Sequence, residues 1–375
     1  MKSFNLQLRS LVREDGTLEL SLQEQETAQP GPDEVLVRIE ATPINPSDLA
    51  LLTAFADMGS ATVSGTADRP IVTAQISAAA MAMLASRVGQ SMPVGNEGAG
   101  VVVEAGSSNS AQALLGRTVG LYGGEMYCQY RCVNVRQCLP MGDGISAAQA
   151  ASCFVNPMTV LSMIETMRSE GHTALIHTAA ASNLGQMLNR VCIADGIELI
   201  NIVRKPEQEA LLRDLGAKHI VNSSSADFYK ELTAKIIETG ATLAFDAIGG
   251  GKLASQILTC METAAARSMS EYNRYGSDTH KQLYIYGGLD QSPTILRRSF
   301  GFAWSVSGWL LPNILQKISK ETMMQMFARV ANEIDSTFAS HYTREVSLAE
   351  ALSLEAIAIY SKQATGEKVL IRPQA

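Results

Sequence analysis

The stretch HTAAASNLGQ, residues 177–186, decides the fold of this 375-residue chain. It overlaps a short apolar run, TALIHT (173–178), which is typical of a buried strand. It also opens a helical stretch, 182–196, that ends at a glycine. The order strand, turn, helix continues downstream, because apolar runs and helical patterns alternate as far as residue 289. Such alternation predicts βαβ units on a parallel sheet.

Small residues occupy the turn at the positions where a dinucleotide-binding GxGxxG turn carries glycine. These positions fall on Ala180, Ser182 and Gly185. In such a turn the glycines permit a tight bend, close approach of a pyrophosphate, and close packing of helix on strand. Ala and Ser are the smallest replacements, and Ser182 is also a good N-cap residue. By itself the turn fits both a phosphate-binding loop and a plain strand–turn–helix without ligand.

The second strand of this region, IELINIV (197–203), is followed by two basic residues, Arg204 and Lys205. An NAD-binding protein carries Asp or Glu at this point for the ribose hydroxyls. A carboxylate would repel a 2′-phosphate, whereas arginine pairs with it. The alternative is a pair of solvated residues at a helix start, where the dipole disfavours positive charge. Together with the turn, the pattern favours NADP(H) over no ligand, and the strand ends FDAIGG (245–250) and IYGGL (285–289) support it.

The rest of the chain divides into regions of different character. Residues 1–150 read as short strands and turns, 151–318 as the α/β domain, and 319–375 as a return to the first domain. The Ala- and Met-rich stretch 71–90 predicts a helix between strands. The stretch 146–167 predicts a helix broken at Pro157.

Composition narrows the function classes. The net charge of −7 argues against nucleic-acid binding, and no window has the ~20 uninterrupted apolar residues of a membrane helix. The N-terminal segment MKSFNLQLRS (1–10) lacks a signal-peptide pattern, and the six cysteines read as reduced thiols. We expect a cytoplasmic protein whose partner is a small molecule.

Several segments, in order, resemble the medium-chain dehydrogenase/reductase superfamily, in particular its zinc-free NADPH:quinone oxidoreductase-like branch. The resemblance extends over nearly the whole chain and keeps the order of the motifs. The segments are VLVRIEATPINPSDLALL (35–52), PVGNEGAGVVVEAG (93–106), NPMTV (156–160), ALIHTAAASNLGQ (174–186), LRDLGAKHIVN (212–222), FDAIGG (245–250), IYGGL (285–289) and GEKVLI (366–371).

The resemblance implies a GroES-like β-rich catalytic domain split by a Rossmann domain with a doubly wound parallel sheet. The implied cofactor is NADPH. Its nicotinamide would lie beside two candidates for the catalytic side, Asn45 and Thr159. The cofactor-binding residues implied elsewhere are Ala180, Ser182, Asn183 and Gly185 at the pyrophosphate, Arg204 and Lys205 at the 2′-phosphate, and Gly249, Tyr286 and Gly287 along the cofactor.

The zinc sites of related alcohol dehydrogenases are not expected in this chain. Two ligand positions resemble Asn45 and Asn96, and the third falls near Val155, two residues from Cys153. Catalytic zinc needs three Cys, His or carboxylate ligands, which two amides do not supply. The cysteines at 128, 132 and 138 lie along one expected strand and do not have the spacing of a structural zinc loop.

The function implied is hydride transfer from NADPH to a quinone or another conjugated carbonyl without zinc. The alternatives are an enoyl-thioester reductase and a non-catalytic NADPH-binding protein on the same scaffold. No proton donor is evident, since Tyr122, Tyr130 and Tyr286 fit packed strand positions and His177 fits a buried strand end.

Three longer stretches depart from the family pattern or extend it. Residues 55–90 and 266–282 are longer than usual. The first reads as one wall of the substrate cleft, the second as a segment that closes over the cleft or reaches a partner subunit, and the alternative for both is surface elaboration. The apolar stretch 300–311 corresponds to an edge strand that the superfamily uses for dimerisation, so a homodimer is expected.

Overall fold

The computed structural model describes residues 4–363 and 366–375, so the first three residues of the N-terminal segment 1–10 lie outside the described part. The chain forms two compact units. Unit 1 comprises Met1–Val155 and Phe327–Ala375, and unit 2 comprises Asn156–Met326. No helix within the described ranges combines the length and apolar character that crossing a membrane requires.

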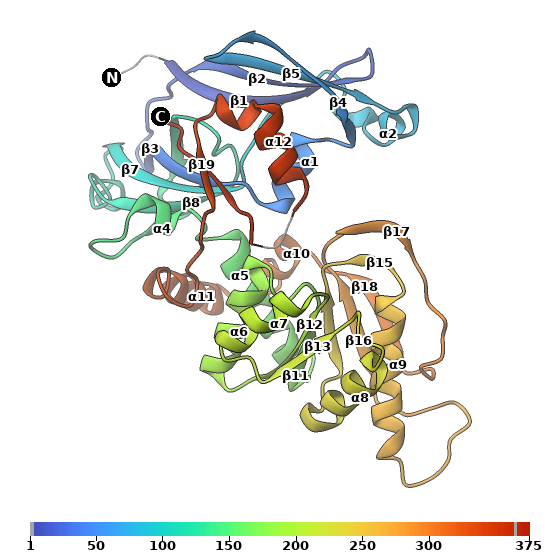
Figure 1. Ribbon diagram of the computed structural model, residues 1–375. Coiled ribbons are helices and arrows are strands. Elements are labelled where there is room, and N and C mark those ends of the chain that lie inside the picture. Colours follow the sequence, from blue (N-terminus) through green and yellow to red (C-terminus); the bar gives the residue numbers. More distant parts are fainter. Residues whose placement is uncertain (1–3, 364–365) are drawn as a thin grey trace. The chain divides into compact units, whose positions relative to one another are not determined.

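Unit 2 is built on a six-stranded sheet in which every pair of neighbours is parallel (Figure 1). In chain order the strands lie 3-2-1-4-5-6, the order of dinucleotide-binding doubly wound sheets. The expected Rossmann sheet is therefore confirmed. Its strands are β13 (His219–Asn222), β12 (Glu198–Val203), β11 (Ala174–His177), β14 (Leu243–Asp246), β16 (Lys281–Ile285) and β18 (Trp304–Gly308).

Helices cover both faces of this sheet. On one face, Ile176 and Ile200 pack in a common core with α8 (Phe228–Thr239) and α9 (Leu253–Arg267). On the other face, Asn201 donates a hydrogen bond to Asn189 of α6 (Asn183–Asp195) over 3.3 Å. Side chains alternate along a strand, which is why Ile200 and Asn201 meet different helices. The remaining elements of unit 2 are α7 (Pro206–Asp214), β15 (Gly249–Gly251), β17 (Asp290–Thr294) and α10 (Leu311–Leu315).

The expected break of the helix 146–167 at Pro157 is wrong. The stretch forms two helices, α4 (Ala147–Ala150) and α5 (Val155–Ser169), and the interruption falls between them. Pro157 lies in the first turn of α5. Its missing N–H removes no hydrogen bond there, because the first backbone N–H groups of a helix have no intrahelical partner.

Unit 1 consists mainly of two sheets with separate apolar cores. This β-rich architecture agrees with the expected GroES-like domain. The first sheet runs β4 (Ala56–Thr66), β5 (Arg69–Ile76), β2 (Thr17–Glu26), β1 (Phe4–Val12), β6 (Ser91–Pro93). The second runs β10 (Cys138–Pro140), β8 (Thr118–Tyr122), β7 (Glu97–Ala105), β3 (Glu34–Pro43), β20 (Val369–Ile371), β19 (Arg344–Val346), and β9 (Tyr130–Asn134) also pairs with β3.

Short helices complete unit 1, and one of them corrects the expectation for residues 71–90. Only α2 (Ala78–Met83) and a short 3-10 turn at 85–87 are helical there, whereas 71–76 belongs to β5. Alternate side chains of β5, Val72, Ala74 and Ile76, are buried, so the two-residue period of a strand outweighs helix propensity. Most of the long stretch 55–90 is thus a hairpin that extends the first sheet. The other short helices are α1 (Leu49–Leu52), α3 (Asn109–Gln112) and α12 (Leu354–Ser361), and the longer α11 (Lys320–Asn332) begins in unit 2 and ends in unit 1.

Candidate functional site

The turn between β11 and α6 is built from small residues. Ser182 caps α6, and its hydroxyl accepts a hydrogen bond from the backbone N–H of Gly185 over 3.1 Å. Gly185 packs so tightly that a Cβ there would lie 2.2 Å from the carbonyl oxygen of Ala180. The left-handed backbone conformation falls on Ala179 (φ 51°), not on Ala180 or Ser182, so Ala and Ser replace glycine without strain. The N-terminal turn of α6, which begins at Asn183, thus lies where a helix can bind phosphate.

The two basic residues after β12 lie in a turn that is held by backbone contacts. The backbone N–H groups of Arg204 and Lys205 donate to the side-chain oxygen of Gln208, over 3.0 and 3.2 Å. Both residues are exposed, and within the described part of the chain neither side chain forms an ion pair. Their charge is therefore available to an anionic ligand at the carboxyl end of β12.

A buried carboxylate organises the loop after β14. Asp246 is inaccessible to solvent, and its Oδ1 accepts hydrogen bonds from the hydroxyl of Thr178 at 2.7 Å and from the N–H of Ile248 at 2.9 Å. The same hydroxyl accepts from the N–H of Ala247 over 2.8 Å. The end of β11 and the loop after β14 are thereby joined at the edge where ligands of parallel sheets bind.

Two glycines bring the loops after β14 and β16 into contact. Gly249 has φ 81°, and a Cβ there would lie 2.8 Å from the carbonyl oxygen of Gly287. A Cβ on Gly287 would lie 2.7 Å from the carbonyl oxygen of Ala247. The glycines are therefore required by loop packing itself.

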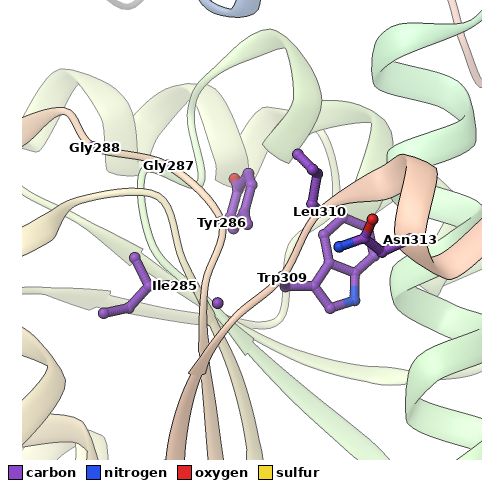
Figure 2. A pocket seen from close by; sticks show the side chains of 8 residues that line it. Ile285, Tyr286, Gly287, Gly288, Trp309, Leu310 and Asn313 are labelled. Carbon is purple, nitrogen blue, oxygen red and sulfur yellow. The ribbon is translucent and has the colours of Figure 1, made fainter. Parts of the chain in front are cut away.

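An open cavity of about 550 Å³ lies at the carboxyl ends of β16 and β18. Figure 2 shows Tyr286 and Trp309 on the two neighbouring chain segments, and their rings meet edge to face with centroids 6.5 Å apart. The Trp309 ring is also held by a hydrogen bond from its Nε1 to the hydroxyl of Thr166 over 3.1 Å. The lining consists of Ile285, Tyr286, Gly287, Gly288, Gly308, Trp309, Leu310 and Asn313. Aromatic and apolar walls beside glycine backbone suit a flat ring.

Tyr286 also contacts the end of β11, which precedes the turn into α6. Its hydroxyl lies 2.7 Å from Nε2 of His177, which is fully buried. Burial lowers the pKa of His177 to about 3, so the imidazole is neutral. Burial also raises the pKa of Tyr286, with the nearby Asp246 charge adding to the effect. This pair is a neutral hydrogen-bonded pair and does not supply a base at neutral pH.

Thr159 and Asn45, the two residues expected on the nicotinamide side, lie in different units. Thr159 is in α5 of unit 2 and is 7% exposed. Asn45 is in unit 1 and is 2% exposed. It precedes the 3-10 turn Pro46–Asp48, at the end of β3.

In unit 1 the segments 45–48 and 96–97 are connected by reciprocal hydrogen bonds. Asn45 donates its side-chain N–H to Oε1 of Glu97 over 2.8 Å. Asp48 accepts from the backbone N–H groups of Asn45 and Asn96, over 2.8 and 3.0 Å. Asn96 in turn donates from its side chain to the hydroxyl of Ser47 over 2.9 Å. Burial raises the pKa of Asp48 to about 7.

Glu97 is fully buried and is surrounded by hydrogen-bond donors. Its second oxygen, Oε2, accepts from the backbone N–H groups of Phe154 and Val155, over 2.7 and 2.8 Å. Burial raises the pKa of Glu97, and the positive charge of Lys368 opposes this. Burial lowers the pKa of Lys368 to about 8, and its Nζ donates to the hydroxyl of Ser152 over 2.8 Å.

Each residue at the position of a zinc ligand donates a hydrogen bond to another group of unit 1. Asn45 donates to Glu97, Asn96 donates to Ser47, and the backbone of Val155 donates to Glu97. Throughout residues 4–363 and 366–375, no three His, Cys, Asp or Glu side chains lie close enough to hold a metal ion. A zinc ion at Asn45 and Asn96 would have two amides as ligands, which does not fit the donors that zinc prefers.

Several of these residues were not singled out from the sequence. Glu97 and Asp246 each lie in an apolar strand run, GNEGAGVVV and FDAIGG, where an isolated carboxylate is the available signal. Trp309 and Lys368 have no comparable local signal. Of the tyrosines considered as proton donors, Tyr122 already donates to the carbonyl of Arg136 over 2.7 Å.

Comparisons with known proteins agree with this geometry. A family model described as the alcohol dehydrogenase GroES-like domain matches residues 31–161, and one described as zinc-binding dehydrogenase matches residues 184–269. Together the two matches cover more than half of the chain. Although the second model is described as zinc-binding, its match does not include Asn45 or Asn96, the two positions compared with zinc ligands above.

Among curated proteins, the chain is similar to a mitochondrial enoyl-[acyl-carrier-protein] reductase of Xenopus tropicalis. The two are 32% identical over 210 residues, which are 54% of this chain and 51% of the relative. The chain thus spans about half the length of that relative.

Among solved structures, the chain resembles a protein assigned as an NADPH:quinone reductase from Mesorhizobium loti. The TM-score is 0.71 at 24% identity, covering 100% of this chain and 99% of the other. A mycobacterial protein in complex with NADPH has a TM-score of 0.67 at 16% identity, covering 98% of this chain and 100% of the other. At these identities the structural likeness concerns the fold.

Proposed function

The chain belongs to the medium-chain dehydrogenase/reductase superfamily, and on that premise we propose that it is an NADPH-dependent reductase of quinones or other conjugated carbonyls. The observation that carries the proposal is the 3-2-1-4-5-6 sheet with the phosphate turn at β11 and two exposed basic residues at β12. The mycobacterial relative whose structure contains NADPH supports the same cofactor.

The residues of unit 2 proposed to bind NADPH are assigned in turn to its pyrophosphate, its 2′-phosphate and its nicotinamide end. The N-terminal turn of α6 receives the pyrophosphate at Ser182 and Asn183, with Ala180 and Gly185 allowing close approach. Arg204 and Lys205 pair with the 2′-phosphate. Strands β14, β16 and β18 lie on the side of β11 opposite to β12. The cavity at β16 and β18 is therefore the proposed place for the nicotinamide end, with Gly249, Tyr286 and Gly287 along the way.

The proposed hydride transfer depends more on the relative position of the nicotinamide and the acceptor than on a metal or acid that withdraws electrons from the acceptor. Bound NADPH supplies the hydride. The rings of Tyr286 and Trp309 orient a flat ring, and neutral His177 holds the Tyr286 hydroxyl. A conjugated acceptor spreads the incoming charge over its own π-system, so the chain needs no metal ligands for this reaction. Asn45 and Thr159 remain the proposed residues of the nicotinamide side.

The proposal is tested by mixing the purified protein with NADPH and a panel of quinones and enals. We expect oxidation of NADPH, seen as loss of its absorbance at 340 nm, with at least one acceptor and not with saturated ketones. No oxidation with any acceptor would contradict the proposal. Tight NADPH binding without turnover would instead favour a non-catalytic NADPH-binding protein.

A second candidate is reduction of enoyl thioesters, which the enoyl-[acyl-carrier-protein] reductase relative favours. Both reactions use the same hydride donor, but a thioester product also requires a proton at the carbon next to the carbonyl. Comparing kcat/KM for a crotonyl thioester with that for a quinone separates the two candidates. A ratio that favours the thioester by tenfold or more would replace the quinone assignment.

We also propose that the protein is a homodimer that pairs through β18. Within the described residues β18 pairs only with β16, so its outer edge carries open backbone donors and acceptors. A second copy would cover this edge by continuing the sheet. Measuring the mass in solution tests this, and a monomer at micromolar concentration would contradict it. The six free cysteines fit the proposed cytoplasmic, reducing location.

A further inference from the structure

Exposed apolar side chains lie at both ends of β18, the edge strand of the sheet in unit 2. Phe302, two residues before the strand, is 81% exposed, and Leu310, two residues after it, is 57% exposed. The Phe302 ring meets the Tyr275 ring edge to face, with centroids 6.2 Å apart, and Tyr275 is 54% exposed. Exposed apolar groups beside an open strand edge are typical of a surface that another chain covers.

The pair Tyr275 and Phe302, here called the aromatic pair, is a built feature of this end of the strand. A Cβ on Gly276 would lie 2.7 Å from Cα of Gly301, so the two loops that carry the rings touch through their backbones. The guanidinium carbon of Arg274 lies 4.7 Å from the centroid of the Tyr275 ring and holds its other side. The aromatic pair therefore has a defined place next to the first residue of β18.

The backbone of β18 shows which of its groups are free to pair. The N–H of Trp309 donates to the carbonyl of Ile285, and the N–H of Lys281 donates to the carbonyl of Ala303, over 2.9 and 3.0 Å. These bonds place the odd-numbered residues of the segment on the side of β16. Backbone groups alternate along a strand, so the even-numbered residues direct their N–H and C=O groups to the open edge. They are Trp304, Val306 and Gly308.

The charge of this segment fits a second copy of the same chain. The chain has a net charge of −7, whereas residues 299–316 contain no Asp, Glu, Lys or Arg. An edge strand that stays unpaired is commonly protected by charged side chains, and β18 has none. Two identical uncharged edges can approach each other without repulsion. Two copies of one strand that pair across a two-fold axis run antiparallel.

Full overlap of the two five-residue strands sets the register. Trp304 lies opposite Gly308 of the second copy, and Val306 lies opposite its own counterpart, so every outward backbone group has a partner. Two residues further along, Phe302 lies opposite Leu310 of the second copy. Leu310 is still extended, with φ −137° and ψ 127°. Opposite side chains of an antiparallel pair lie on the same face of the sheet, about 5 Å apart at Cβ, so the two exposed apolar groups meet.

We propose that a second copy of this chain pairs antiparallel with β18 about Val306, and that its aromatic pair packs on Leu310. Leu310 lines the cavity at the carboxyl ends of β16 and β18 (Figure 2), so Phe302 of each copy becomes part of the cavity wall of the other. This inference rests on the proposed homodimer. It adds the register, the residues that meet, and a cavity whose wall two chains share.

The register is tested by disulfide formation in the double variant Phe302→Cys with Leu310→Cys. With oxidised glutathione we expect a covalent dimer on a non-reducing gel, because directly opposite residues have Cα atoms about 5.5 Å apart, within the range of a disulfide. Each single variant should stay unlinked, since residue 302 of one copy lies eight residues, about 27 Å, from residue 302 of the other along the strand. The unaltered protein gives the background from its six native cysteines.

The contribution of the aromatic pair is tested by Phe302→Lys, with the dimer dissociation constant measured by analytical ultracentrifugation. We expect dissociation to become at least tenfold easier, because the variant loses a buried ring and places a charge against Leu310. Tyr229→Lys is the matched control. Tyr229 is 49% exposed on α8, which packs on β12 and β13, toward the edge of the sheet opposite to β18. It should leave the dissociation constant unchanged.

The outcomes separate the inference from the proposals on which it rests. A dimer whose double variant forms no disulfide, or whose single variants form as much, would overturn the register and leave the homodimer standing. Equal effects of Phe302→Lys and Tyr229→Lys would overturn the contact of the aromatic pair. A monomeric unaltered protein would overturn the homodimer as well. Oxidation of NADPH by quinones and enals decides the reductase separately, and the dimer mass of each cysteine variant under reducing conditions shows that it is folded.

Discussion

Gly185 lies against Ala180 with no room for a side chain between them. A Cβ at position 185 would come 2.2 Å from the carbonyl oxygen of Ala180 and 2.8 Å from its Cα. Both atoms belong to the backbone, so they cannot move aside without changing the turn. The last glycine of the expected phosphate turn is thus required by the contact of helix with turn, whatever the ligand.

Gly185→Ala is expected to displace α6 from the turn and weaken NADPH binding. Such overpacking against backbone costs about 1–3 kcal/mol or more in the free energy of unfolding. Denaturant unfolding and NADPH titration check the two effects. Gly142→Ala is the control, because a Cβ there meets nothing within 4 Å and the backbone is not left-handed. Equal behaviour of the two variants would contradict the packing argument.

The basic residues after β12 are expected to set the preference for NADPH over NADH. Arg204→Ala removes a charge-assisted contact, worth about 1.5–3 kcal/mol, and should weaken NADPH binding about 10- to 100-fold. Binding of NADH should change little, because it lacks the 2′-phosphate. The free energy of unfolding should also stay the same, since both basic side chains are exposed.

Arg213→Ala serves as the control for this prediction. Arg213 is also exposed, and it pairs with Glu209 across one turn of α7. Its loss removes one positive charge from the helix that follows Arg204, without touching the proposed phosphate site. A loss of NADPH affinity as large as that of Arg204→Ala would point to net charge and not to a specific contact.

Acidification is expected to destabilise unit 2 through His177. The pKa of this histidine is about 3 in the folded protein, below the value of about 6.5 in an unfolded chain. Between these values the unfolded chain binds more protons, so stability falls as the pH is lowered. The contribution approaches about 1.4 kcal/mol per pH unit well below pH 6.5.

The measurement is the free energy of unfolding from pH 7 to pH 4.5 for the unaltered protein and for His177→Gln. As the pH is lowered, the free energy of unfolding of the unaltered protein should fall more steeply than that of His177→Gln, by up to about 1.4 kcal/mol per pH unit. Other titrating groups contribute equally to both proteins. Asp48 is one such group, and its raised pKa acts in the opposite direction. His341→Gln, at an exposed position, should retain the slope of the unaltered protein. Parallel curves for the protein and His177→Gln would show that His177 is not responsible.

A buried ion pair at the start of β16 is expected to matter for stability alone. Lys281 is inaccessible to solvent, and its Nζ donates to Glu262 over 2.5 Å. Glu262→Gln leaves this charge without its counter-ion, which costs about 3–5 kcal/mol. Lys281→Met combined with Glu262→Gln should recover part of the loss, because no buried charge remains. If the double variant is less stable than Glu262→Gln, the unpaired charge is not the cause.

The local chemistry of the candidate site could be predicted because consecutive residues carry it. The turn from Ala180 to Gly185 and the pair Arg204 and Lys205 each lie within a few residues, and their spacing follows from one strand and the next helix. The parallel pairing of the strands could be expected too, because strands alternate with helices, but the order of the strands was not predicted. Local propensity failed at residues 71–76, where the β5 hairpin pairing outweighs the preference of nearby alanines for helix.

The sequence by itself determined the parallel sheet, the small-residue turn between β11 and α6, and the two positive charges after β12. Only the tertiary structure decided which polar groups meet inside each unit. Asn45 forms a hydrogen bond with Glu97, which lies 52 residues later in the sequence, and His177 forms one with Tyr286, which lies 109 residues later. Such pairs depend on strand register and on which neighbours share a face of a sheet, and no local pattern encodes either. The buried groups that orient Asn45 and Tyr286 therefore became visible only once the strands were paired.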